Sequence, residues 1–174
     1  DLNRDAARFY YQTLHQPEGR AVQEYLNRRK ISRTTAVNSG LGASPDAWDA
    51  LLTAMTKKGY TKSELLEAGL VVQNRNGGLY DKFRNRLMFP VIDIRGDVVA
   101  FGGRVLDKSE PKYMNTQETP VYSKRRVLYG LNLAKKTKRP NIILCEGNID
   151  VVTLHQAGFD NAVASMGTAL TVEQ

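Results

Sequence analysis

Two carboxylates near the end of the sequence could hold a divalent metal ion. Glu146 directly follows the short apolar run of residues 142–145, and Asp150 lies four residues further on, where a helix is expected to begin. Such a run is typical of a buried parallel strand, and open α/β sheets bind ligands beyond the carboxyl ends of their strands. Carboxylate oxygens, water and substrate phosphates are the usual ligands of Mg²⁺. The residues alone equally allow a simpler interpretation, in which Asp150 complements the helix dipole and Glu146 is solvated.

The distribution of charge indicates a polyanionic partner. The 174-residue chain carries 25 Lys and Arg against 18 Asp and Glu, a formal net charge of +7. Residues 71–145 hold 15 of the basic and 6 of the acidic residues, whereas residues 146–174 hold 4 acidic residues and no Lys or Arg. A basic region of this kind attracts nucleic acid or nucleotides, and acidic residues beside such a region favour metal ions.

The elements that must position the two carboxylates can be predicted from the pattern of apolar residues. An apolar strand at 142–145, a helix at 149–157 and a second strand at 161–164 form a βαβ unit. The second strand is followed by Gly167-Thr168, which we expect at the same edge of the sheet as Glu146. The carboxylates therefore stand at the ligand-binding end of a small parallel sheet.

The first 70 residues are predicted to be helical. The expected helices cover residues 5–14, residues 20–29, a segment that begins at the N-cap Ser44 and buries Trp48, and a segment between the capping box Thr61–Glu64 and Gly69. Between about residues 71 and 101 the pattern changes to strands, with hairpin turns at Asn76-Gly77 and Arg95-Gly96. Residues 109–126 are polar and basic and are interpreted as a functional loop.

The expected fold is therefore an α+β N-terminal subdomain of helices and antiparallel hairpins, followed by the start of an α/β domain. The basic run from Lys135 to Pro140 reads as a solvated linker. We accordingly place the N-terminal basic subdomain at residues 1–138 and the incomplete α/β domain at residues 139–174.

Composition excludes several classes of protein. An apolar share of 41% with 25% charged residues is ordinary for a globular chain. No apolar run approaches the roughly 20 residues of a membrane span, and no signal peptide is present, so we expect a cytoplasmic protein without a membrane partner. Cys145 is the only cysteine, and His15 and His155 are distant from it in sequence, so neither a disulfide nor a zinc site is expected within this chain. Because the chain does not begin with Met, we interpret it as a fragment.

Several segments resemble a known family. LCEGNIDVV resembles the opening of a Toprim domain, which also occurs in topoisomerases and nucleases. The upstream segments are more specific: YDKFRNRLMFPVIDIRGDVVAFGGRVL, PKYMNTQET and SKRRVLYGL, with VASMGTALT further on, closely resemble the core of bacterial DNA primase of the DnaG type. The resemblance is strong over about residues 70–174, and the helical start agrees with it only in character.

The resemblance implies roles for particular residues. Glu146 matches the catalytic, metal-binding glutamate of the Toprim domain, and Asp150 matches its neighbouring acid. The implied nucleotide- and template-binding residues are Arg84, Arg86, Lys112, Tyr113, Asn115 and Lys124. Their chemistry agrees with these roles, since Lys and Arg neutralise phosphate charge and a tyrosine ring can stack on any base.

The implied activity is that of a DNA-directed RNA polymerase, which makes short RNA primers from ribonucleoside triphosphates on a single-stranded DNA template with Mg²⁺ or Mn²⁺. The family binds zinc in a separate N-terminal domain and the replicative helicase through a C-terminal domain, neither of which lies in this chain. An Asp-x-Asp pair of the Toprim pattern is expected beyond residue 174, so we expect the chain alone to be inactive. Two alternatives stay open here: another Toprim enzyme, such as a topoisomerase or nuclease, and a non-catalytic module that binds single-stranded DNA.

Overall fold

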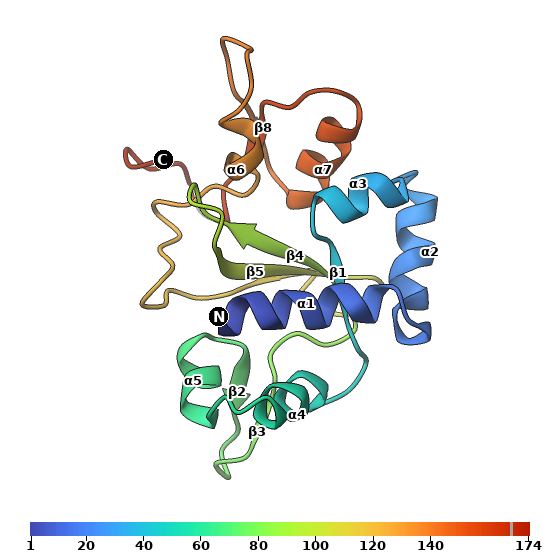
Figure 1. The fold of residues 1–174 in the computed structure, drawn as a ribbon, viewed down its shortest axis with the longest axis vertical. Coiled ribbons are helices and arrows are strands. Elements are labelled where there is room, and N and C mark those ends of the chain that lie inside the picture. Colours follow the sequence, from blue (N-terminus) through green and yellow to red (C-terminus); the bar gives the residue numbers. More distant parts are fainter. Residues whose placement is uncertain (168) are drawn as a thin grey trace.

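A four-stranded antiparallel sheet, in the order β1-β4-β5-β6, lies at the centre of the fold (Figure 1). The computed structural model describes residues 1–167 and 169–174. The strands of this sheet are β1 (Gly42–Ser44), β4 (Arg86–Ile92), β5 (Val98–Val105) and β6 (Tyr113–Asn115). The turn between β4 and β5 contains Gly96 with φ +94°, which confirms the predicted hairpin. A second predicted hairpin is also confirmed: β2 (Val71–Gln73) pairs with β3 (Leu79–Asp81).

The N-terminal helices surround this sheet. They are α1 (Leu2–Leu14), the short 3-10 helix η1 (Pro17–Gly19), α2 (Arg20–Arg28), α3 (Arg33–Asn38), α4 (Ala50–Lys57) and α5 (Lys62–Glu67). Helix α1 packs against β1 so closely that a Cβ added to Gly42 would lie 2.6 Å from the Cβ of Tyr10. The capping box predicted at Thr61 and Glu64 is present at the start of α5. None of the helices in the described part of the chain is long and apolar enough to cross a membrane.

The prediction for the start of α4 was wrong. Ser44 is not an N-cap but the last residue of β1, where it pairs with Arg86. Helix α4 begins at Ala50, and the buried carboxylate of Asp81 accepts hydrogen bonds from the backbone N–H groups of Leu51 and Leu52, at 2.8 and 2.9 Å. The acceptor at the helix start therefore comes from a strand 30 residues away, which a local pattern does not reveal. Trp48, predicted to be buried, is 65% exposed.

The predicted βαβ unit is confirmed. Strands β7 (Ile143–Cys145) and β8 (Ala162–Ala164) are parallel and flank α7 (Asn148–Gln156). Tyr129, which precedes the short helix α6 (Leu131–Ala134), adds two backbone hydrogen bonds to Ala164 at 2.8 and 3.0 Å. Buried side chains of α7 and β8 share one hydrophobic core with β4 and β5, so the unit is packed directly against the central sheet.

The predicted burial of the strand before Glu146 was only partly right. Ile142 and Leu144 are 51% and 49% exposed. Successive side chains of a strand point to opposite faces, and in the described part of the chain only one face of β7 packs against the core. The apolar run therefore indicated the strand correctly but overestimated its burial.

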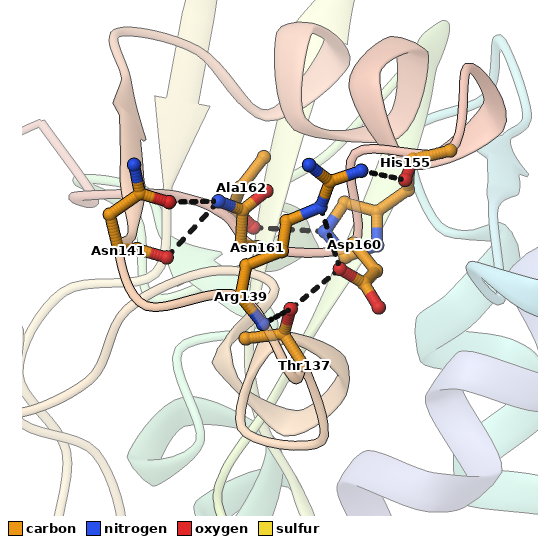
Figure 2. A network of polar contacts seen from close by, with 8 residues as sticks. Thr137, Arg139, Asn141, His155, Asp160, Asn161 and Ala162 are labelled. Carbon is orange, nitrogen blue, oxygen red and sulfur yellow. Dashed lines mark hydrogen bonds and ion pairs between the residues drawn. The ribbon is translucent and has the colours of Figure 1, made fainter.

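Figure 2 shows that the segment before β7 is fixed to the turn before β8. Thr137 Oγ1 donates a hydrogen bond to Asp160 at 2.6 Å, and Arg139 Nε lies 3.6 Å from the same carboxylate oxygen. Asn161 Nδ2 donates to the carbonyl of Asn141 at 3.0 Å. The run predicted as a solvated linker is therefore held in place by the contacts of Thr137 and Arg139 with Asp160. The subdomain boundary between residues 138 and 139 stays a prediction.

Candidate functional site

The acidic turn lies at the carboxyl end of β7. Glu146 and Asp150 are both exposed, and Gly147 between them is the N-cap of α7. A Cβ added to Gly147 would lie 3.4 Å from Asp150 Oδ2 and 3.8 Å from Tyr113 Oη. The turn that carries both carboxylates is therefore adjacent to β6, although about 30 residues separate the two segments in sequence.

The two segments also meet at the backbone of β5. A Cβ added to Gly102 would lie 2.8 Å from Asn148 Nδ2 and 3.1 Å from Asn115 Oδ1. A Cβ added to Gly167 would lie 3.2 Å from Asn115 Nδ2. Asn115 therefore lies near Gly167, which follows β8, and together with Asn148, which follows β7, it lies against Gly102. This arrangement agrees with the prediction that the residues after β7 and β8 lie at the same edge of the small sheet. Thr168, predicted beside Gly167, lies outside the described residues.

The acidic turn could hold a hard divalent cation. Mg²⁺ is commonly bound through one or two carboxylates and completes its coordination with water and substrate phosphates. Glu146 and Asp150 supply donors of this kind, but no three His, Cys, Asp or Glu side chains gather as a metal site within residues 1–167 and 169–174. Two carboxylates are enough for Mg²⁺ where water and substrate phosphates supply its other ligands. Burial, followed by the negative charge of Asp150, raises the pKa of the neighbouring Cys145 thiol.

The two arginines predicted upstream have different surroundings. The Arg84 guanidinium lies 4.2 Å from the centre of the Trp48 ring and 5.3 Å from that of Tyr80, and it donates a hydrogen bond to the Asp81 carbonyl at 2.6 Å. Because Trp48 is largely exposed, this pair forms an aromatic and cationic surface that could stack against a base. A core position was predicted for Trp48 because the sequence pattern placed it inside a helix that begins at Ser44, whereas α4 begins at Ala50.

Arg86, in contrast, is only 5% exposed. Its guanidinium donates hydrogen bonds to the carbonyls of Gly103 and Lys112, at 3.4 and 3.2 Å. Burial lowers its pKa, and the nearby charge of Arg84 acts in the same direction. Arg86 therefore holds the backbone at Lys112, directly before β6, and so helps to set where the chain of Lys112 and Tyr113 runs.

Lys82 is a further residue of the site that the sequence analysis missed. Its Nζ donates a hydrogen bond of 2.7 Å to the Asn115 carbonyl. Burial, and after it the positive charge of Lys124, lowers the pKa of Lys82. The backbone of Lys124 is held by a hydrogen bond of 2.8 Å from its N–H group to the Glu118 carboxylate. The alternation of Lys82 with Arg84 along the chain was the signal that could have identified it.

The βαβ unit and the acidic turn place the end of the chain in the class of proteins with a Toprim domain. A family model of the Toprim domain matches residues 141–174, and a model of the N-terminal domain of the DNA primase catalytic core matches residues 9–135. The chain belongs to the DNA primase family. The primase model matches the segment before the Toprim unit, so the chain is assigned to the primases and not to the topoisomerases or nucleases that share the Toprim domain.

Relatives and solved structures agree with this assignment. The chain is 48% identical to the DNA primase of Clostridium acetobutylicum over 174 residues, which is 99% of this chain and 29% of that protein. It is 41% identical to the DNA primase of Escherichia coli over 167 residues, 95% of this chain and again 29% of the relative. The chain thus spans less than a third of the length of these relatives.

Two solved structures superimpose closely. One is the DnaG primase catalytic domain bound to single-stranded DNA, with a TM-score of 0.93 and 39% identity over 99% of this chain and 56% of that one. The other is the Escherichia coli primase catalytic core, with a TM-score of 0.92 and 40% identity over the same shares. These matches confirm the expected α+β subdomain followed by the start of a Toprim domain.

Proposed function

We propose that this chain forms part of the active centre of a DNA-directed RNA polymerase that makes short RNA primers on single-stranded DNA. The observation that carries the proposal is the contact between the acidic turn and β6. Gly147, which lies between Glu146 and Asp150 in sequence, adjoins both Asp150 and Tyr113. An acidic, metal-competent turn next to a basic and aromatic surface fits nucleotidyl transfer, which requires both charge neutralisation and a template.

The acidic residues would hold Mg²⁺ or Mn²⁺ together with a nucleotide. Glu146 is the proposed catalytic ligand, and Asp150 is its neighbour on the first turn of α7. A bound divalent ion activates the attacking hydroxyl and stabilises the leaving group in reactions of this type. Both side chains are exposed, so they can reach an ion that is shared with a triphosphate.

The basic residues would bind ribonucleoside triphosphates and the template. Tyr113 lies on β6 and Lys112 directly precedes it. Lys124 lies near Lys82, and Arg84 lies against the exposed ring of Trp48. Lys82 and Arg86 are assigned supporting roles, because each donates hydrogen bonds to backbone carbonyls near β6. A structure similar to this chain is of a catalytic domain bound to single-stranded DNA, which supports the same partner here.

The remaining parts of the proposal concern the longer protein. We place the basic subdomain at residues 1–138 and the Toprim unit from residue 139, and we expect zinc only in a separate N-terminal domain. Further proposed partners are the RNA primer and the replicative helicase, the latter through a C-terminal domain outside this chain. A cytoplasmic location at the replication fork follows from this function.

The test is primer synthesis by a protein that contains this chain and a complete Toprim domain. With single-stranded DNA, four ribonucleotides and Mg²⁺ or Mn²⁺, Glu146→Gln should abolish RNA products, because the amide cannot replace the charge of a metal ligand. Binding of single-stranded DNA should stay within about twofold, since the DNA affinity depends mainly on the cationic side chains.

The matched control is Glu67→Gln, the same substitution on the exposed side of α5. It should leave both synthesis and DNA binding unchanged. Full activity of the Glu146→Gln protein would contradict the assignment of the site. DNA binding without any synthesis by the parent protein would favour a non-catalytic binding module.

A further inference from the structure

Tyr25 of α2 lies at the centre of a cluster of cations beside β6. The Arg104 guanidinium lies 4.8 Å from the centre of the Tyr25 ring and 5.8 Å from the centre of the Tyr113 ring. Arg29 Nε donates a hydrogen bond of 3.1 Å to the Tyr25 hydroxyl. The Arg29 guanidinium also lies 5.7 Å from the centre of the Tyr25 ring, so Tyr25 contacts both arginines with its ring and Arg29 with its hydroxyl group as well.

Among the described residues, no carboxylate forms an ion pair with these cations. In the described part of the chain, the ion pairs involve other arginines, and none includes Arg29, Arg104 or Lys112. Arg104 donates one hydrogen bond to the Val105 carbonyl at 2.8 Å, and its buried Nε has no acceptor among the described residues. Aromatic faces offset only part of the mutual repulsion of such cations, so a polyanion would stabilise the arrangement further.

The cluster continues the surface that begins at the acidic turn. Gly147 adjoins Tyr113, Tyr113 adjoins Arg104, and Tyr25 then connects Arg104 to Arg29 on α2. Tyr25 itself is only 7% exposed, whereas Tyr113 is 45% exposed. A buried ring in this position cannot stack on a base, so any effect of Tyr25 on nucleic acid must act through the two arginines.

We propose that Tyr25 is a positioning residue for nucleic acid, which holds Arg29 and Arg104 where they contact the phosphates of a single strand. In this arrangement the single strand of nucleic acid passes from the acidic turn across Tyr113 toward α2. The inference rests on the proposed function, because it requires that the basic surface binds single-stranded DNA. It adds a buried aromatic residue that organises the cations of that surface.

The experiment is a double-mutant cycle that uses binding of a fluorescent oligothymidylate at constant salt concentration. Tyr25→Phe keeps the ring beside Arg104 but removes the hydroxyl that accepts from Arg29. We expect an affinity loss of about two- to fivefold, which is in the range of the net contribution of one ordinary hydrogen bond. In an Arg29→Ala background the same substitution should cause no further loss, because the residue through which it acts is absent.

The ring contact is tested in the same way with Arg104. Tyr25→Leu should weaken binding by about three- to tenfold, as expected for a partly buried cation–π contact, and this loss should be smaller in an Arg104→Ala background. Tyr60→Phe is the matched control, since it removes a hydroxyl that donates to Asp5 on α1 at 2.6 Å. Its DNA affinity should equal that of the parent.

The outcomes separate this inference from the proposed function. Equal losses from Tyr25→Phe with and without Arg29 would show a general structural role and overturn the inference. An unchanged affinity of Tyr25→Phe, in a protein that melts at the parental temperature, would overturn it as well. Absence of DNA binding by the parent protein would instead contradict the proposed function, on which the inference depends.

Discussion

At the scale of single residues, the same side-chain type at alternating positions serves different purposes. Arg84 lies against the exposed Trp48, whereas Arg86 is buried and bonds to backbone carbonyls. The family resemblance implied a shared binding role for both, and their spacing shows only that two residues lie on the same side of a strand. Burial distinguishes them, and burial depends on β5 and the segment before β6, which are distant in sequence.

A hydrogen bond between Tyr60 and Asp5 gives a pH-dependent prediction. Tyr60 Oη donates to Asp5 Oδ2 at 2.6 Å, which lowers the pKa of Asp5 below its ordinary 3.8 and raises that of Tyr60 above its ordinary 10.0. The contribution of Asp5 to stability is present above its unfolded pKa and is lost as the pH falls through the lower folded value. The contribution of Tyr60 is present below its unfolded pKa and is lost as the pH rises through the higher folded value.

Tyr60→Phe should therefore lower the free energy of unfolding throughout the neutral range. The difference from the parent should begin to shrink below about pH 4 and above about pH 10, where the two groups titrate in the unfolded chain. It should be lost once the pH passes the lower folded pKa of Asp5 or the higher folded pKa of Tyr60. Denaturant unfolding of both proteins across this range measures the difference directly. A difference that stays constant from neutral to strongly acidic pH would show that the hydroxyl and the carboxylate are not coupled.

At the scale of helices and strands, the sequence correctly predicted those elements that depend on residues close together in the chain. The capping box at Thr61 and Glu64, the hairpin at Gly96 and the βαβ unit are confirmed, because each depends on residues close together in sequence. The start of α4 was wrong because its acceptor is Asp81, on a distant strand. The contact between β6 and the acidic turn was implied only by the family resemblance, since no local pattern connects residues about 30 positions apart.

The junction between β5 and the βαβ unit depends on Gly102. A Cβ at this position would lie 2.8 Å from Asn148 Nδ2 and 3.1 Å from Asn115 Oδ1. Both Asn side chains are half-buried and have little room to move, so Gly102→Ala should force them out of their present positions, at a cost of about 1–3 kcal/mol in the free energy of unfolding. Primer synthesis should fall on the order of 100-fold, because small displacements of catalytic groups are disproportionately costly.

The corresponding control is Gly78→Ala in the β2–β3 hairpin. There a Cβ would meet the exposed side chain of Asn74 at 2.9 Å, and this side chain can rotate away. Its primer synthesis should match that of the parent protein. If Gly102→Ala lowers stability but leaves synthesis unaffected, the close approach of β5 is needed for packing and not for the site.

At the scale of the whole molecule, charge is divided between the two ends of the β4–β5 hairpin. Arg104 lies at the end near β6, together with Lys112 and Tyr113. The turn at the opposite end borders a groove of about 850 Å³. The charged residues that line this groove are Asp1, Arg4, Glu64, Glu67, Asp93, Arg95 and Asp97. Acidic residues outnumber basic ones there, so a nucleic acid should bind at only one end of the hairpin.

This asymmetry predicts how DNA binding depends on salt. Each phosphate contact that is lost should flatten the slope of log affinity against log salt concentration by about 0.7 for single-stranded DNA. Lys112→Ala should therefore weaken binding of oligothymidylate and flatten the slope by roughly that amount. Arg95→Ala removes the same charge from the opposite end of the hairpin and should leave the slope unchanged. Equal changes for the two variants would mean that DNA responds to the net charge of +7 and not to one surface, which would contradict a defined path past the acidic turn.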